Sequence, residues 1–226
     1  MAQFAKLARE NNIALVVDET YRDFVEHFPP HNMFSPMEPD RPSWSWRSHI
    51  IHLYSFSKSY AIPGHRLGVA VASPEVLKYM MTTLDCMQVC APRPPQLALA
   101  NVLLLPELRS SILSNAEALK ARQELFRKLL PSGWTIGSQG GYYAFVKHPF
   151  QNMSSVAFAQ RLAMELGVLV LPAQFFYNEA DETERQALGL SEDGWDRWLR
   201  FSIANVNDEQ IVKVCERLSG CKAHFE

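Results

Sequence analysis

The sequence is poor in three features that mark well-known classes of protein. It has four cysteines in 226 residues, without CxxC spacing and without a secretory leader ahead of them, so we expect reduced thiols in a cytosolic protein. Its most apolar stretch, Leu97–Leu105, is far shorter than the roughly 20 residues that a membrane-spanning helix needs. The 22 Lys and Arg nearly balance the 24 Asp and Glu, and no basic cluster is dense. We therefore expect neither a membrane segment nor nucleic acid as a partner.

Metal ligands at useful spacing are scarce as well. His27 and His31 flank a Pro-Pro pair, but the sequence offers no third ligand near them. Cys86 and Cys90 lie four residues apart on a predicted helix and supply only two thiols. We predict no metal site, and we interpret these side chains as loop histidines and packed cysteines.

The apolar content of 47% is high enough for one sizeable core or two modest ones, which excludes a disordered or fibrous chain. Residues 1–12 have helical periodicity, and the apolar runs at 13–17 and 50–56 are continuous, as in parallel strands covered on both faces. Residues 68–72 predict a third strand, and Ser73 followed by Pro and Glu predicts the start of a helix. The first half of the chain is therefore expected to be α/β with a mostly parallel sheet.

The second half predicts a long amphipathic helix followed by a small α/β domain. Apolar side chains form one stripe along residues 107–130, and a later helix is expected from Ser154 to Gly167. The last helix is expected to begin at Asn207, in a capping-box pattern, and to stop before Gly220. Strands are predicted within residues 134–136, 141–146, 168–171 and 198–205.

Polar side chains follow the first two predicted strands where each strand ends. Asp18 and Tyr21 come after the first strand, and Ser55, Ser57 and Lys58 come after the second. In an α/β sheet the carboxyl ends of the strands carry the chemistry, so these residues are the first candidates for a site. A solvated surface lysine is the alternative on spacing alone.

Two motifs carry a resemblance to a known family. The segment SFSKSYAIPGHRLG, residues 55–68, resembles the cofactor-lysine signature of class I/II pyridoxal-phosphate-dependent aminotransferases of fold type I, with lysine, glycine and arginine at the family's spacing. DETY, residues 18–21, lies upstream at the end of a strand, as the family's Asp and Tyr do. The resemblance implies transfer of an amino group between an amino acid and a 2-oxo acid through a lysine-bound pyridoxal phosphate.

The resemblance also implies a role for each residue of the two motifs. Lys58 would hold the cofactor aldehyde and then move a proton as the general base. Asp18 would pair with the pyridinium nitrogen, and Tyr21 would donate to the phenolate oxygen. The phosphate would be bound by three polar side chains within a tight glycine-containing backbone, namely Ser55, Ser57 and Arg66 with Gly64 and Gly68.

Arg200, in LRFSIAN, resembles the arginine with which the family binds the substrate carboxylate. Arg197 lies three residues earlier, and a surface salt bridge is the alternative for either arginine. GGYYAFV, residues 140–146, resembles a small-domain strand near the active site, although a glycine turn before a hairpin explains it equally well. The aromatic residues at 175–177 either close the site or belong to a core, which is the commoner role of such clusters.

The resemblance covers the C-terminal portion of an aminotransferase. Residues 1–106 would be the C-terminal part of the cofactor-binding large domain, and residues 107–226 the inter-domain helix and small domain. The first strands would then lack some neighbours, leaving an exposed apolar patch. The full-length chain would form a homodimer, whereas the activity of the 226-residue portion by itself is in doubt. Two alternatives stay open: a carbon-sulfur β-lyase on the same scaffold, and a non-catalytic fragment or partner-binding remnant.

Overall fold

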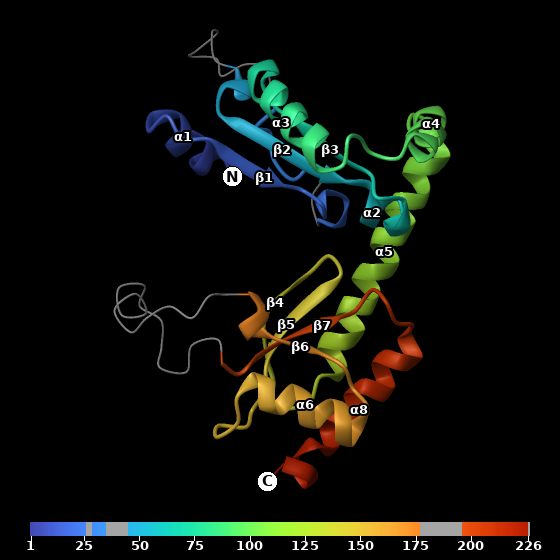
Figure 1. Cartoon of the computed structure of the whole chain (residues 1–226). Coiled ribbons are helices and arrows are strands. Elements are labelled where there is room, and N and C mark those ends of the chain that lie inside the picture. The colour runs from blue at the N-terminus through green and yellow to red at the C-terminus, as the bar shows by residue number, and fades with distance from the viewer. Residues whose placement is uncertain (26–28, 35–44, 177–195, 226) are drawn as a thin grey trace. The chain divides into compact units, whose positions relative to one another are not determined.

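The computed structural model describes residues 1–25, 29–34, 45–176 and 196–225, so His27 and Tyr177 lie outside the described residues. The chain divides into two compact units, Met1–Ala116 and Glu117–Glu226. The sequence predicts a boundary at residues 106 and 107, at the start of the long helix. The structure instead divides the chain within that helix, α5 (Pro106–Leu129), which belongs to both units (Figure 1).

The first unit contains a three-stranded sheet in the order β1-β2-β3. β1 pairs with β2 in parallel, whereas β2 and β3 are antiparallel. The expected mostly parallel sheet is therefore not confirmed, because the chain returns beside β2 in the antiparallel direction after the short connection of residues 56–67, without the crossover helix that parallel strands need. The bounds of the elements are α1 Ala2–Glu10, β1 Leu15–Asp18, β2 Ile50–Ser55, α2 Phe56–Ser59, β3 Gly68–Val71, α3 Pro74–Met87 and α4 Arg93–Val102, with short 3-10 turns η1 Arg22–Phe24, η2 Trp46–Ser48 and η3 Pro63–His65.

Local sequence explains where the elements of the first unit begin. The hydroxyl of Ser73 accepts a hydrogen bond from the backbone N–H of Val76 at 3.2 Å, and a proline occupies the first position of α3, as the sequence predicts. The core of this unit is small and contains Val17, Met33, Trp46 and Ile50 among the described residues. β1 is only partly covered: Val16 is 56% exposed, and Ile13, just before the strand, is 59% exposed.

The second unit contains a four-stranded antiparallel sheet in the order β4-β5-β7-β6. The strands are β4 Thr135–Gly140, β5 Tyr143–Lys147, β6 Leu171–Pro172 and β7 Trp198–Ser202, and they are accompanied by α6 Ser155–Leu166, the 3-10 turn η4 Ala173–Phe176 and α8 Asp208–Phe225. A large apolar core packs α5, α6 and α8 with this sheet and includes Phe126, Phe158 and Leu199. The small α/β domain predicted from the sequence is thus present.

The ends of the helices in the second unit show both a success and an error of the sequence analysis. Ser154 caps α6 through the N–H of Ala157, and Gly167 ends it in the left-handed conformation with φ 62°. Asn207 caps α8, but the expected stop before Gly220 is wrong, since the helix continues to Phe225. Cys221 is buried in the core, so packing of the last turn outweighs the low helix propensity of glycine.

No single helix in the described ranges is long and apolar enough to cross a membrane. Only α4 and α5 taken together, across a bend of 99°, reach that length and composition. All four cysteines are free thiols. Cys215 and Cys221 are buried, whereas Cys86 and Cys90 are exposed, so the packing expected of this pair is wrong. Burial raises the pKa of each of the two buried thiols to about 11.

Candidate active site

Lys58 lies on a short helix that begins where the central strand of the first sheet ends. The hydroxyl of Ser55, the last residue of β2, accepts a hydrogen bond from the backbone N–H of Ser57 at 3.3 Å and so caps α2. Ser57 is buried, whereas Lys58 is half-buried. The cap thus fixes the backbone of the turn that presents the lysine at the carboxyl end of β2.

Asp18 lies at the same end of the sheet. It is the last residue of β1 and pairs in register with Leu53 of the parallel strand β2. Oδ1 of Asp18 accepts two hydrogen bonds from Thr20, one from the backbone N–H at 3.0 Å and one from the side-chain hydroxyl at 2.7 Å. Asp18 is exposed to solvent. Tyr21 follows, half-buried, directly before η1. The structure therefore brings the DETY segment and the lysine turn to one end of the sheet.

Arg66 reaches this end of the sheet through the antiparallel strand. Gly68, the first residue of β3, pairs with Ser55, and the N–H of Phe56 donates to the carbonyl of Leu67 at 3.2 Å. Arg66 itself is exposed and has φ 53°, and its guanidinium donates to the carbonyl of Pro63 at 2.9 Å. A Cβ at Gly68 would lie 3.2 Å from the carbonyl of Tyr54, so glycine suits this close approach of two strands.

A buried carboxylate that the sequence analysis did not single out anchors the DETY segment. Glu19 is 8% exposed, and its Oε1 lies 2.7 Å from Nε2 of His31, while its Oε2 contacts Arg22 and lies 2.9 Å from Nε2 of His52. Burial lowers the pKa of His52, although the Glu19 charge opposes this shift. His31 is therefore a partner of Glu19 and more than a loop histidine.

A second buried acid, also missed from the sequence, joins the two motifs. Asp23 is 8% exposed, accepts a hydrogen bond from the hydroxyl of Tyr54 at 2.8 Å, and forms an ion pair with Arg109 of α5. Burial acts to raise the pKa of Asp23, but the hydrogen bonds from Arg109 and from neighbouring hydroxyls hold it below its usual value. No short-range pattern could have revealed either acid, because most of their partners lie far away in the sequence.

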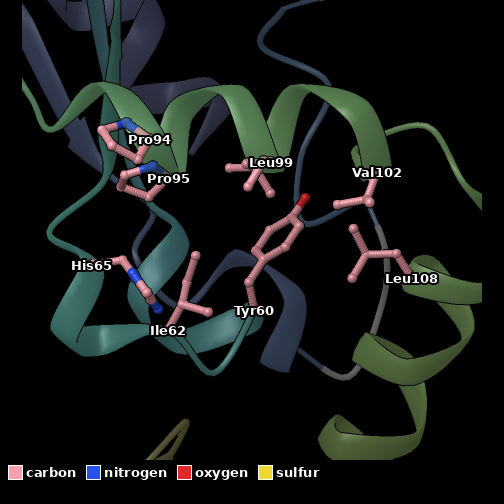
Figure 2. A pocket seen from close by; sticks show the side chains of 9 residues that line it. Tyr60, Ile62, His65, Pro94, Pro95, Leu99, Val102 and Leu108 are labelled. Atoms are coloured by element: carbon pink, nitrogen blue, oxygen red, sulfur yellow. The ribbon is translucent and has the colours of Figure 1, made fainter.

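An apolar pocket of about 530 Å³ lies beside the segment that follows Lys58. Figure 2 shows the ring of Tyr60 extending from this segment toward Leu99 and Val102 of α4. The pocket is lined by Tyr60, Ile62, His65, Pro94, Pro95, Ala98, Leu99, Val102 and Leu108. Because these side chains are almost all apolar, the pocket is unsuited to a phosphate or a carboxylate.

Arg200 belongs to the second unit, on β7, opposite Phe145 of β5. Its guanidinium carbon lies 4.2 Å from the centre of the Tyr143 ring and 4.5 Å from that of Phe176. Arg197 is buried, so the alternative interpretation of this arginine as part of a surface salt bridge is wrong. The sequence predicts that the aromatic cluster belongs to a core unless it closes the site. For Phe176 the core interpretation is wrong, because the residue is 45% exposed, and its ring lies against Arg200.

The residues at the end of the first sheet fit pyridoxal phosphate by the chemistry of their functional groups. The cofactor carries a pyridinium nitrogen, an aldehyde and a phosphate, which call for a carboxylate, an amine and a guanidinium with hydroxyls. Asp18, Lys58 and Arg66 supply these groups, and Ser55 and Ser57 supply the hydroxyls.

Comparison with known proteins indicates one family. The sequence model of the aminotransferase class I and II family matches residues 1–218. The chain is 27% identical over 195 residues to an aspartate aminotransferase of Thermococcus kodakarensis, covering 86% of this chain and 48% of that protein. It is 31% identical over 148 residues to a histidinol-phosphate aminotransferase of Geotalea daltonii, covering 65% and 38%. The chain thus spans less than half the length of the curated relatives named here, 38% and 48%.

Solved structures agree on the fold. The crystal structure of an aromatic aminotransferase from Pyrococcus horikoshii superposes with a TM-score of 0.79 at 20% identity, covering 99% of this chain and 54% of that one. A Thermus thermophilus aspartate aminotransferase gives a TM-score of 0.73 at 25% identity, covering 95% and 52%. With its lysine turn, its DETY segment and a family match over nearly its whole length, the chain belongs to the aminotransferase class I and II family.

Proposed function

We propose that the protein of which this chain is part is a pyridoxal-phosphate-dependent aminotransferase. The observation that carries the proposal is the meeting of Asp18, Lys58 and Arg66 at one end of a sheet in a member of this family. Its substrates are an amino acid and a 2-oxo acid. That the complete protein is a cytoplasmic homodimer stays a prediction.

The roles of the side chains follow from their chemistry. When bound, the cofactor supplies an electron sink for the bond that breaks at the substrate α-carbon. Lys58 would hold the cofactor aldehyde through its amine and, as a general base, would move the proton at that carbon. Asp18 would keep the ring nitrogen protonated, and Tyr21 would donate a hydrogen bond to the ring oxygen.

The remaining candidates bind anions. Arg66, with the hydroxyls of Ser55 and Ser57, would hold the cofactor phosphate, because a planar guanidinium can donate two hydrogen bonds to it. Arg200 binds the substrate carboxylate and fixes the orientation of the α-carbon. Its contacts with Tyr143 and Phe176 support this role, because two aromatic rings restrict the guanidinium to few orientations before a carboxylate arrives.

The proposal is tested by covalent labelling of the 226-residue chain with pyridoxal 5′-phosphate and borohydride, followed by peptide mapping. We expect the label at Lys58 and its loss in Lys58→Ala. Lys78→Ala is the matched control, because Lys78 is exposed on α3 of the same unit. A label spread evenly over the surface lysines, or one unchanged by Lys58→Ala, would contradict the assignment.

The reaction class is tested by product analysis. A new amino acid formed from a supplied 2-oxo acid indicates amino transfer, whereas release of ammonia indicates a β-lyase on the same scaffold. In a preparation that turns over, Arg200→Ala should lower kcat/KM by about tenfold or more for both the amino acid and the 2-oxo acid, since both carry the carboxylate. A loss confined to one substrate would indicate a side-chain pocket instead.

A further inference from the structure

Asp23 joins three segments that are distant in the sequence. Its own segment, η1, begins directly after Tyr21 of the DETY motif. One carboxylate oxygen accepts the hydroxyl of Tyr54, which lies on β2 four residues before Lys58, and the other oxygen pairs with Arg109 of α5. The Asp23 side chain is 6% exposed, so its carboxylate is shielded from water, whereas the Arg109 side chain is 39% exposed.

The Tyr54 side of this contact continues directly into the lysine turn. The ring of Tyr54 packs edge-on against Phe56 with centres 5.3 Å apart, and Phe56 packs edge-on against Tyr60 at 5.1 Å. These three aromatic residues precede and follow Lys58 on the short helix α2 and its flanks. A displacement of Tyr54 would therefore pass to the backbone that carries the lysine.

The electrostatics keep the contact in a single state near neutral pH. The pKa of Asp23 lies below its usual value, as described above, so its carboxylate is charged and accepts hydrogen bonds. Burial raises the pKa of Tyr54, so its hydroxyl stays protonated and donates. The two groups are thus a fixed donor and a fixed acceptor, and neither titrates in the range where the enzyme would work.

We propose that Asp23 is a positioning residue for Lys58, acting through Tyr54, and that it aligns the lysine turn with the Asp18–Tyr21 segment. This inference rests on the proposed function, since it assumes that Lys58 is the residue that binds the cofactor. Asp23 does not itself meet the cofactor in this proposal. It ties the backbone of the DETY segment to the strand that ends in the lysine turn.

The test measures the rate at which Lys58 reacts with pyridoxal 5′-phosphate in the whole chain. The lysine nitrogen bonds to the aldehyde carbon, the carbonyl oxygen leaves as water, and cyanoborohydride then supplies hydride to make the bond permanent. Peptide mapping gives the ratio of label at Lys58 to label at the exposed Lys78 and Lys120. We expect this ratio to fall by about tenfold in Asp23→Asn, because misplacement of a reacting group lowers its rate steeply.

Three further variants separate positioning from general loss of structure. Tyr54→Phe removes one hydroxyl and keeps the ring, so it should lower the ratio less than Asp23→Asn does. The double variant Asp23→Asn/Tyr54→Phe should lower it by less than the sum of the two single effects, since both changes weaken the Asp23–Tyr54 contact and only Asp23→Asn also removes the ion pair with Arg109. Asp85→Asn makes the same change of charge at an exposed position of α3 and should leave the ratio unchanged.

The outcomes are distinguishable. Lack of preference for Lys58 in the unaltered chain would overturn both the proposed function and this inference. Preference for Lys58 that is equal in the unaltered chain, Asp23→Asn and Tyr54→Phe would overturn the inference alone. If Asp23→Asn does not fold, Tyr54→Phe decides: a reduced ratio with an unchanged melting temperature supports positioning, and an unchanged ratio refutes it.

Discussion

Ala61 and Arg66 lie on either side of the η3 turn, and both have a φ of 53°. This left-handed conformation costs a residue with a Cβ roughly 1 to 2 kcal/mol, and it is glycine's conformation by preference. Arg66 keeps a side chain there despite the cost, which is consistent with its proposed contact with the phosphate. No binding role is proposed for Ala61, so a glycine at that position should relieve the backbone strain without loss of a contact.

We predict that Ala61→Gly stabilises the chain by about 0.5 to 1 kcal/mol, the relief of backbone strain less the entropy that glycine adds to the unfolded state. Urea unfolding gives the free energy. Ala121→Gly is the control, since Ala121 lies within α5 and should lose about 1 kcal/mol through the poor helix propensity of glycine. A loss of stability in Ala61→Gly would contradict the account of strain.

The buried side chain of His148 should make the stability of the chain depend on pH. It is 1% exposed, stacks on Phe158 with ring centres 4.4 Å apart, and neither ring nitrogen has a hydrogen-bond partner among the described residues. Burial, aided by the charges of Arg197 and Lys147, lowers its pKa from 6.5 to about 4. Folding thus favours the neutral ring, so the unfolded chain binds more protons between these two values.

The consequence is a loss of stability as the pH falls. The contribution of neutral His148 is complete above pH 6.5 and is lost progressively down to about pH 4, on the order of 3 kcal/mol in total. Urea unfolding at several pH values measures this dependence. His148→Phe preserves the stacking without the charge and should flatten the curve over this range; an equally steep curve in that variant would refute the assignment.

At the scale of the element, β4 is built around a glycine that an aromatic ring covers. A Cβ at Gly137 would lie only 2.3 Å from the ring of Trp198 on β7, which itself stacks on Phe145 of β5. Gly137 also lies at the irregularity in the pairing of β4 with β5, between Ile136 and Ser138. The glycine therefore lets the ring of Trp198 extend past the intervening strand β5 and lie against the backbone of β4.

Gly137→Ala should destabilise the chain by about 1 to 3 kcal/mol, because the ring of Trp198 must move to admit the methyl group. Gly140→Ala is the matched control on the same strand, since a Cβ there would meet nothing within 4 Å. Thermal unfolding together with tryptophan fluorescence distinguishes the two. Equal effects of both substitutions would show that the cost comes from the strand and not from the ring.

The elements also show how far sequence can predict this fold. Caps such as Ser73, Ser154 and Gly167 act within a few residues, so their patterns predict helix ends correctly. The direction of β3 and the continuation of α8 past Gly220 depend on which surface each segment meets, which no local pattern contains. The sequence therefore predicts the presence of helices and strands more reliably than it predicts how they pack against one another.

The candidate site divides in the same way. Lys58, Asp18 and Arg66 stand out in short motifs, and the pairing of the strands supports their grouping at one end of the sheet. Asp23 does not stand out, because its partners Tyr54 and Arg109 lie 31 and 86 residues away in the chain. Residues that support a site need only a suitable neighbour in space, and a single sequence does not record such neighbours.

For the whole molecule, the two units differ in how much apolar surface they bury. Among the described residues, fifteen buried side chains form the core of the second unit, and four form that of the first. Burial of apolar side chains is the main source of folding free energy. The unit that carries Lys58 is therefore expected to open at a lower free energy than the unit that carries Arg200.

Hydrogen–deuterium exchange followed by mass spectrometry measures this difference directly. Amides of β1 and β2 should exchange about tenfold faster or more than those of β5 and β7, a ratio that corresponds to about 1.4 kcal/mol of opening free energy. The paired backbones of both sheets make hydrogen bonds of the same kind, so secondary structure alone would protect them alike. Equal protection of the two sheets would contradict the expected order.

Because the two cores differ in size, we expect the two units to lose their structure at different temperatures. On heating, the reactivity of Lys58 should decline while the helical signal of α6 and α8, which pack in the larger core, is still nearly complete. Heat inactivation would then be a local event, reversible on cooling, and would precede the cooperative unfolding that circular dichroism records. The temperature at which function is lost and the temperature at which structure is lost become two separate properties of one chain.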